Sequence, residues 1–187
     1  MLGKGDETFA NKGNNVKREI ILRRASMADA ELLFTWKNDK ATIENSITKR
    51  GVTMEEHVKW LEGIVDNPMR QLYILDVDGV SVGQLRLDVE KLKTTEEAIE
   101  VEDVKNASID MEYIVAEISY GLGAEHRGKG LGKVLLEQAE TLAQLFGIDK
   151  LVAEVLPHNM ASRKLFLSLG FKEEKKEDIY VYQKQYG

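Results

Sequence analysis

Two patterns of apolar residues run through the chain and predict its secondary structure. Alternation of apolar and polar residues is typical of strands, and apolar repeats every three or four residues are typical of amphipathic helices. Strands are predicted at residues 19–23, 72–77, 80–87, 117–122, 150–156, 171–175 and 179–184. Four helices are predicted. Two lie between the first two strands, a third follows residue 130 and a fourth follows residue 159. The resulting order, βααβββαβαββ, predicts a sheet with helices packed against it.

Capping residues predict where the two early helices begin. Ser26 and Asp29 are spaced to cap the first helix, and Thr53 and Glu56 form a capping box for the second, which Asn67-Pro68 ends. The first helix is predicted to turn inward Leu32, Leu33 and Trp36. The second is predicted to turn inward Met54, Val58, Leu61 and Val65. Between the next two strands, Asp78-Gly79 is a pair that favours a tight hairpin.

The helix after residue 130 is predicted to turn inward Leu131, Leu135, Ala139, Leu142 and Phe146. Asn159 is a good N-cap for the next helix, and Gly170 suits the left-handed residue that ends it. Residues 1–17 are rich in Gly, Asn and Lys and carry no periodic apolar residue, so they are predicted to form a disordered tail. Residues 18–187 are then expected to form a single domain.

A glycine-rich segment joins the strand at residues 117–122 to the helix that follows. Glycines at 128, 130 and 132 leave room for an oxyanion, and the N-terminal end of a helix favours negative charge. The segment also carries positive side chains at His126, Arg127, Lys129 and Lys133. Together these features predict a site for a cofactor that contains phosphates.

Spacing separates three classes of phosphate ligand. Residues 123–129 match the nucleoside triphosphate loop up to its last position, but Gly130 stands where that loop needs a Ser or Thr to hold magnesium. The glycines also lack the register and the following acidic residue of a dinucleotide site. The third class is coenzyme A, whose pyrophosphate loop fits the spacing Arg127-x-x-Gly130-x-Gly132 at every specified position.

Composition narrows the function classes further. The chain has 187 residues, 43% of them hydrophobic, and a formal net charge of −6, which argues against a nucleic-acid partner. It has no Cys, so disulfides and thiolate metal sites are excluded, and no metal is expected. No apolar run is long enough to cross a bilayer, and the first residues lack the apolar block of a signal peptide. A cytoplasmic protein without a membrane partner is the expectation.

Two segments resemble signatures of the GNAT superfamily of acyl-CoA N-acetyltransferases. They are the glycine loop and the segment from Val155 to Phe171, which contains Asn159, Ser162 and Gly170. The order of elements resembles that family over residues 20–186, while the specific motifs occupy residues 117–171. The resemblance implies an α/β (α+β) GNAT fold with a central mixed, mostly antiparallel twisted sheet flanked by helices. It also implies acetyl-CoA as the acetyl donor.

By the same resemblance, coenzyme-binding residues are expected on three elements. The strand contributes backbone groups of Tyr120 and Leu122, where the pantetheine arm pairs like an added strand. The loop and helix start contribute Arg127, Gly128, Lys129, Gly130, Leu131, Gly132 and Lys133. The next helix start contributes Asn159 and Ser162. Asn159 fits equally well as a plain helix cap, and both roles are compatible.

The acetyl-transfer chemistry needs a base and tolerates the lack of an acid. Glu117 is the candidate base, because by the resemblance enzymes with an Ala-Glu-Ile sequence carry their catalytic glutamate there. Glu112 is the second choice for the base. A role of Glu117 in orienting the acceptor or in a structural ion pair stays open. Many members of the family place a Tyr that protonates the leaving thiolate seven residues after the position of Asn159, where this chain has Phe166. Tyr120 and Tyr113 are the available substitutes, and the role of general acid stays unassigned.

The amine acceptor is expected to contact the early helices. Four segments, at residues 36–39, 56–60, 67–74 and 83–84, look similar to N-acetyltransferases of nucleotide-linked amino sugars. By that likeness Lys37, Asn38 and His57 are expected to contact the acceptor. The tryptophans fit core positions equally well, and His57 fits a structural role. Other acceptors stay open, namely a protein N-terminus, a polyamine or an antibiotic, as does a CoA-binding module without turnover.

Residues 89–113 are longer than the short turn of a minimal version of this fold. They fit either an extension of both flanking strands into a protruding ribbon or a short helix. A solvated acidic loop, a contact in a possible homodimer and a cover over the acceptor are the alternative roles.

Overall fold

The computed structural model describes residues 18–96 and 109–186. The predicted tail at residues 1–17 lies outside the described residues. No helix in these described ranges has the length and apolar character needed to span a membrane. The strands are β1 (Ile20–Arg24), β2 (Arg70–Val77), β3 (Val80–Glu96), β4 (Ile109–Leu122), β5 (Lys150–Val155), β6 (Lys172–Lys175) and β7 (Tyr180–Gln185). The helices are α1 (Ala30–Lys37), α2 (Lys40–Glu44), α3 (Met54–Val65), α4 (Leu131–Leu145) and α5 (Met160–Ser168).

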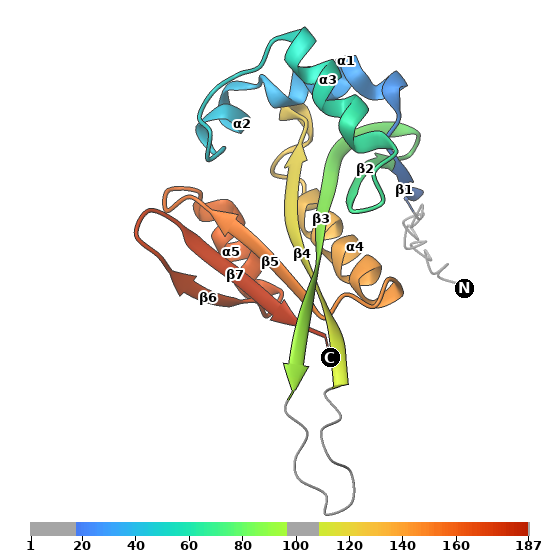
Figure 1. Cartoon of the computed structure of the whole chain (residues 1–187). Helices are drawn as coiled ribbons and strands as arrows, with labels where there is room; N and C mark the ends of the chain where they lie inside the picture. Colours follow the sequence, from blue (N-terminus) through green and yellow to red (C-terminus); the bar gives the residue numbers. More distant parts are fainter. Residues whose placement is uncertain (1–17, 97–108, 187) are drawn as a thin grey trace, which may run out of the picture.

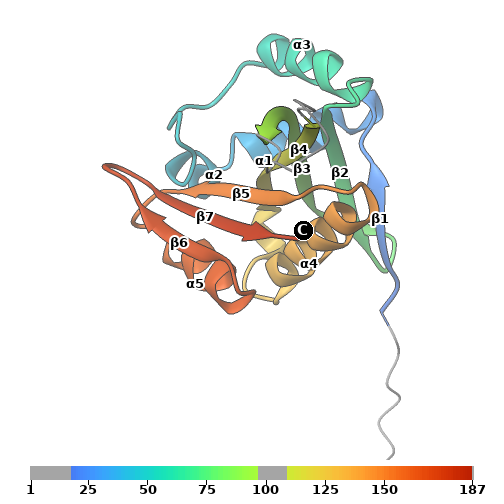
Figure 2. The ribbon, with the colours of Figure 1, turned by 60° about the horizontal axis from the view of Figure 1, so that its bottom comes forward.

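The seven strands form one mixed sheet in the order β1-β2-β3-β4-β5-β7-β6. All neighbours are antiparallel except β4 and β5, which are parallel. Helices cover both faces, with α1 and α3 on one side and α4 and α5 on the other (Figures 1 and 2). The predicted fold class, a mostly antiparallel mixed sheet flanked by helices, is confirmed.

The sheet divides between β4 and β5. These two strands pair only at Val115–Lys150, Ala116–Leu151 and Glu117–Val152. β4 continues for five residues to Leu122, and β5 continues to Val155, without further pairing between them. The two halves of the sheet therefore separate after Glu117, and the edge of β4 from residue 118 to residue 122 has no neighbouring strand on the β5 side among the described residues.

Two apolar clusters hold the helices against the sheet. On β2, Tyr73 and Leu75 belong to the cluster beneath α4 and α5, whereas Leu72 and Ile74 belong to the cluster beneath α1 and α3. This division follows from the alternation of side chains along a strand. Burial on both faces explains why residues 72–75 read as an unbroken apolar run.

Both predicted capping signals are present. Asp29 Oδ2 accepts the Ser26 N–H at 2.8 Å, and Thr53 and Glu56 form a reciprocal capping box. The Asp78-Gly79 hairpin is also confirmed, since both residues have positive φ, 51° and 77°, as a type I′ turn requires.

Three helical details differ from the sequence prediction. A short helix, α2, lies between the two early helices, and it was not predicted. Met54 is 40% exposed, because α3 turns inward a stripe of His57, Leu61 and Ile64 instead. Phe146 is 45% exposed, because it is the C-cap of α4 and lies beyond the buried stripe, which Ala143 ends.

The connection at residues 89–113 is a strand extension as far as the structure describes it. β3 runs to Glu96 and β4 begins at Ile109, and the two remain in register over Val89–Ala116 to Glu96–Ile109. This is the ribbon alternative rather than the short helix. The part of the prediction that concerns residues 97–108 lies outside the described residues.

A charged network anchors the start of α1 to β1 and β2. Arg23 donates to Asp29 at 2.8 and 3.0 Å and to Asp76 at 2.9 Å, and Asp29 itself is buried. These Arg23 hydrogen bonds are the main reason why the pKa of Asp29 is lowered. The carboxylate therefore stabilises the fold above the ordinary pKa of aspartate, and this contribution is lost as the pH falls through the lower, folded-state pKa.

We expect Asp29→Asn to lower the free energy of unfolding by about 2 kcal/mol at pH 7, a value reduced for the partial exposure of Arg23. Urea unfolding at pH 7 and pH 3 measures it, and the difference from wild type should shrink at pH 3. Asp178→Asn, at an exposed position of the β6–β7 turn, is the control and should change little. Equal stability of Asp29→Asn and wild type at pH 7 would contradict the assignment.

Candidate functional site

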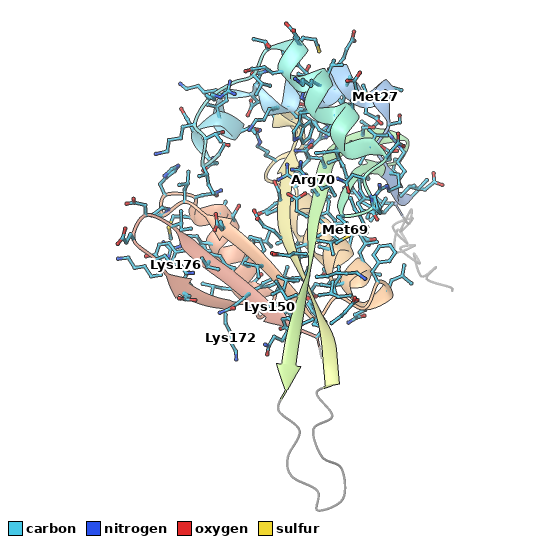
Figure 3. All side chains as sticks on the ribbon, in the orientation of Figure 1. Met27, Met69, Arg70, Lys150, Lys172 and Lys176 are labelled. Atoms are coloured by element: carbon cyan, nitrogen blue, oxygen red, sulfur yellow. The ribbon has the colours of Figure 1, made fainter. Side chains whose placement is uncertain are left out.

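A cavity of about 950 Å³ lies where β4 and β5 part. Its walls come from α1, α2 and α3 on one side and from the first residues of α4 and α5 on the other, with β3 and β4 as the floor. Figure 1 shows how these two groups of elements are arranged around β3 and β4, and Figure 3 adds the side chains in the same view. The volume suits a ligand of cofactor size.

The open edge of β4 presents backbone N–H groups to this cavity. Gly123 N–H donates to Val82 C=O on β3 at 3.0 Å. Because N–H groups alternate in direction along an antiparallel strand, those of Ser119 and Gly121 also face β3, and those of Tyr120 and Leu122 face the gap. An extended chain that carries amides can pair with this edge as an additional strand.

The loop between β4 and α4 forms a cradle. Gly128 and Gly130 have φ of 73° and 79°, and a Cβ at either position would meet no described atom within 4 Å. In the first turn of α4, Lys133 N–H bonds Gly130 C=O at 3.1 Å, so Leu131 and Gly132 N–H lack an intrahelical partner. Open space and free N–H groups at a helix start together fit a pair of linked phosphates.

Arg127 ties this loop to α2. Its Nη2 donates to Asp39 Oδ2 at 2.5 Å and to Thr42 Oγ1 at 3.1 Å, and Asp39 in turn caps α2 through Thr42 N–H. The Arg127 hydrogen bond is the largest cause of the lowered pKa of Asp39. Arg127 thus positions the loop and α2 together, in addition to lining the cavity.

Nine of the eleven predicted coenzyme-binding residues line the cavity. They are Tyr120, Leu122, Arg127, Gly128, Gly130, Gly132, Lys133, Asn159 and Ser162. The Leu131 side chain is instead buried in the core, so only its backbone N–H is available. Lys129 is exposed and lies outside the lining.

Asn159 and Tyr120 both form hydrogen bonds with Ser162 at the start of α5. Asn159 Oδ1 accepts Ser162 N–H at 3.2 Å, which confirms its role as a cap and leaves its Nδ2 group to donate to a ligand. Tyr120 Oη lies 2.8 Å from Ser162 Oγ, and burial raises the pKa of this phenol. Tyr120 is therefore a protonated hydroxyl at neutral pH within the cavity wall.

The two other aromatic positions considered for proton donation lie elsewhere. Phe166 is 1% exposed and stacks on Tyr182 with ring centroids 5.2 Å apart, so it is a core residue. Tyr113 lies near the start of β4, where its hydroxyl accepts from Gln185 Nε2 at 3.4 Å. Of the two substitute tyrosines, only Tyr120 lines the cavity.

Glu117 lies at the point where β4 and β5 part, as the last β4 residue in their pairing. It shares a strand face with Ser119 and Gly121, which line the cavity, but is itself outside the lining. Its pKa is raised, first by restricted solvation and then by Glu154 and Asp88, while Arg86 opposes the shift. Glu112 lies five residues farther down β4, in an ion pair with Lys91 at 3.0 Å.

Two of the three predicted acceptor contacts, Lys37 and His57, line the cavity. Asn38 does not. Its Oδ1 accepts Val52 N–H at 2.9 Å, and its Nδ2 donates to Phe34 and Val52 carbonyls, so its polar atoms link the end of α1 to the segment before α3.

His57 has an unsatisfied nitrogen in this wall. The side chain is 3% exposed and packs between Phe34 and Trp60. Burial is the largest cause of its lowered pKa, so the ring is neutral at pH 7. Its Nε2 is buried without a hydrogen-bond partner in the described ranges.

Arg50 and Arg86 were not predicted as site residues, but they line the cavity together with Lys37 and His57. A signal for Arg86 existed, because Gln84 and Arg86 alternate with the buried Leu85 and Leu87 and must face the opposite side of β3. Arg50 lies in the irregular segment before α3, and no periodic pattern marks it. No three His, Asp or Glu side chains gather as possible metal ligands in residues 18–96 and 109–186.

Residues 19–172 match the family model described as an acetyltransferase (GNAT) domain. YncA of Salmonella typhimurium, provisionally described as an acetyltransferase and solved with its cofactor acetyl-CoA, has the same fold with a TM-score of 0.63. It is 21% identical, and the match covers 89% of this chain and 93% of that one.

Two curated relatives are similar in sequence. YwnH of Bacillus subtilis, provisionally named a phosphinothricin acetyltransferase, is 43% identical over 58 residues, which are 31% of this chain and 36% of that protein. The uncharacterized protein MJ1062 of Methanocaldococcus jannaschii is 28% identical over 179 residues, covering 88% of this chain and 31% of that protein. The match thus spans about a third of the length of each of these curated relatives.

Proposed function

The chain belongs to the acetyltransferase (GNAT) family, and on this basis we propose that it transfers an acetyl group from acetyl-CoA to a primary amine. The single observation that carries the proposal is the continuous surface made by the open β4 edge and the glycine cradle. The cradle has free N–H groups and open space for a diphosphate, and the β4 edge has N–H groups for an amide-containing arm.

We propose the following roles for the cofactor-facing residues. Backbone N–H groups of residues 128–132 hold the diphosphate, with Lys133 adding positive charge beside them. The N–H groups of Tyr120 and Leu122 hold the arm, and Asn159 Nδ2 donates to it. One of the two β4 N–H groups then also lies near the reacting carbonyl oxygen, where a fixed donor stabilises developing negative charge.

When bound, acetyl-CoA supplies a thioester carbonyl that a neutral amine attacks, so that a C–N bond forms, the C–S bond breaks and the thiolate leaves. Glu117 accepts the proton that the amine must lose, through a water in the gap above the last β4–β5 pair. Its raised pKa brings it closer to the pH at which a base is effective. Tyr120 keeps its proton at neutral pH and can return one to the leaving sulfur.

For the acceptor, we propose the amine of a nucleotide-activated amino sugar. Oxygens next to such an amine withdraw electrons and lower its pKa below that of a lysine side chain, so a larger fraction is neutral. A carboxylate of moderate basicity then suffices as the base. Lys37 and His57 are the proposed contacts, and a protein N-terminus, a polyamine and an antibiotic are the alternative acceptors.

A second candidate function is a CoA-binding module without turnover. The observation that favours it is Phe166, a buried core residue at the position where the family resemblance implies a proton-donating tyrosine. The two functions share the coenzyme site and differ only in chemistry.

Release of free thiol from acetyl-CoA tests the proposal. We expect coenzyme A to bind in calorimetry, and thiol release to require both the protein and an amine from a panel of UDP- and TDP-linked amino sugars, spermidine and peptide amines. Binding without release for every amine would instead support the module without turnover. Failure to bind coenzyme A would refute both functions.

A further inference from the structure

The cavity is strongly basic although the chain is acidic. The formal net charge is −6, yet among the described residues six Lys or Arg residues and only one carboxylate, Glu56, line the cavity. Arg127 and Lys133 lie at the glycine loop. The other four cations, Lys37, Arg50, Lys59 and Arg86, lie on the opposite side, which the coenzyme proposal does not use.

Lys37, Arg50 and Arg86 form a cluster of like charges. The pKa of Lys37 is lowered, first by burial and then by repulsion from Arg86 and Arg50. The Lys37 Nζ hydrogen bond goes to Ser46 Oγ at 3.3 Å, and no carboxylate lies within ion-pair distance of it among the described residues. Such a cluster costs free energy unless an anion joins it.

The carboxylates of the protein only partly neutralise this cluster. Glu56 pairs with Arg50 at 3.2 Å, but it also accepts the Thr53 N–H in the α3 capping box. Asp88 pairs with Arg86 Nη2 at 3.0 Å and with Arg70 at 3.1 Å. Arg86 Nε is buried and has no partner in the part of the chain that the structure describes. A donor is thus left for a ligand.

His57 adds a second unsatisfied atom to the same wall. Its Nε2 is buried, neutral and unpartnered, and its ring lies 5.4 Å from the Trp60 ring, over which the Arg86 guanidinium is placed at 5.9 Å. A neutral imidazole has one N–H donor and one acceptor nitrogen. The His57 ring bonds the Ala30 backbone while Nε2 has no partner among the described residues, so the proton lies on Nδ1 and Nε2 is an acceptor, whereas Lys and Arg only donate. The wall therefore combines anion-binding donors with one acceptor suited to a hydroxyl.

We propose that Lys37, Arg50 and Arg86 bind a phosphate or diphosphate group of the amine substrate, while His57 Nε2 accepts a hydrogen bond from one of its hydroxyls. This proposal rests on the proposed acetyl transfer and defines its substrate class as amines that carry an anionic phosphate. The same cations repel polyamines, which carry several positive charges.

Calorimetry of the CoA-saturated protein tests this subsite, because coenzyme A then occupies the glycine cradle. Uridine diphosphate and inorganic pyrophosphate are the two probes. We expect both to bind, and Lys37→Gln and Arg86→Gln to weaken binding by about tenfold or more, since each removes a charge-assisted donor. Tighter binding of uridine diphosphate than of pyrophosphate supports a nucleotide-linked substrate; equal binding supports recognition of the phosphates alone.

Lys172→Gln is the charge-matched control, because Lys172 is exposed on β6 (Figure 3) and does not line the cavity. It should leave probe affinity unchanged, and all three variants should keep wild-type affinity for coenzyme A. If coenzyme A binds but neither probe does, or if the Lys37 and Arg86 variants bind the probes as wild type does, the phosphate subsite is refuted while the acetyltransferase proposal stands. Loss of coenzyme A binding in wild type refutes the proposed function itself.

Discussion

Replacing Gly130 with Val is expected to raise the dissociation constant for coenzyme A on the order of 100-fold. Gly130 has φ of 79° and is the N-cap of α4, so a β-branched side chain there strains the backbone and occupies the space left open for the phosphates. Isothermal titration with coenzyme A measures the effect. No described atom beyond the chain neighbours lies within 4 Å of an added Cβ, so the space that a side chain would enter is the space proposed for the phosphates.

Gly147→Val separates backbone strain from loss of the cradle. Gly147 also has positive φ, 64°, with open space around its Cβ position, but it lies after the C-terminal end of α4. This variant should lose stability comparably and keep its affinity for coenzyme A. Unchanged affinity in Gly130→Val, or equal loss in both variants, would show that the loop does not hold the diphosphate.

Glu117→Gln is expected to lower kcat by roughly 10²- to 10⁴-fold, while the dissociation constant of coenzyme A stays within about twofold. The amide keeps the shape of the side chain and removes the proton acceptor. In wild type, the rate should rise with pH through the pKa of Glu117, because the ionised form is the base. Restricted solvation, Glu154 and Asp88 raise this pKa, so the acidic limb should lie above the pKa of an ordinary glutamate.

Glu112→Gln is the matched control on the same strand. Its carboxylate pairs with Lys91 at the surface, so kcat and the acidic limb should persist. A Glu117→Gln enzyme with wild-type kcat would remove Glu117 from the role of base. Retention of the acidic limb in that variant would assign the titration to another group.

Local signals predicted much of the fold correctly. The capping boxes at Ser26 and Thr53 and the Asp78-Gly79 turn depend on hydrogen bonds and φ values within a few residues, so the sequence carries them in full. The inward stripe of α3 was correct for Leu61 and wrong for Met54, because Met54 reads as more hydrophobic than His57. Tertiary packing against Phe34 and Trp60 buries the histidine instead.

The glycine cradle was predictable because its residues are adjacent in the chain, whereas the opposite wall of the cavity was not. Arg50 and Arg86 come from separate segments, and only the packing of α3 over the sheet brings them near Lys37. α2 was missed for a related reason. Its five residues are too few for a periodic pattern, and it is held by Asp39 and by Arg127, 88 positions later.

A crystal structure of the protein with coenzyme A tests the central claim most directly. We predict that the two linked phosphates lie within hydrogen-bond distance of the N–H groups between Gly128 and Gly132, and that the pantetheine arm runs along β4 beside Tyr120 and Leu122. Phosphates bound at any other part of the surface, or an arm that leaves the β4 edge free, would contradict it.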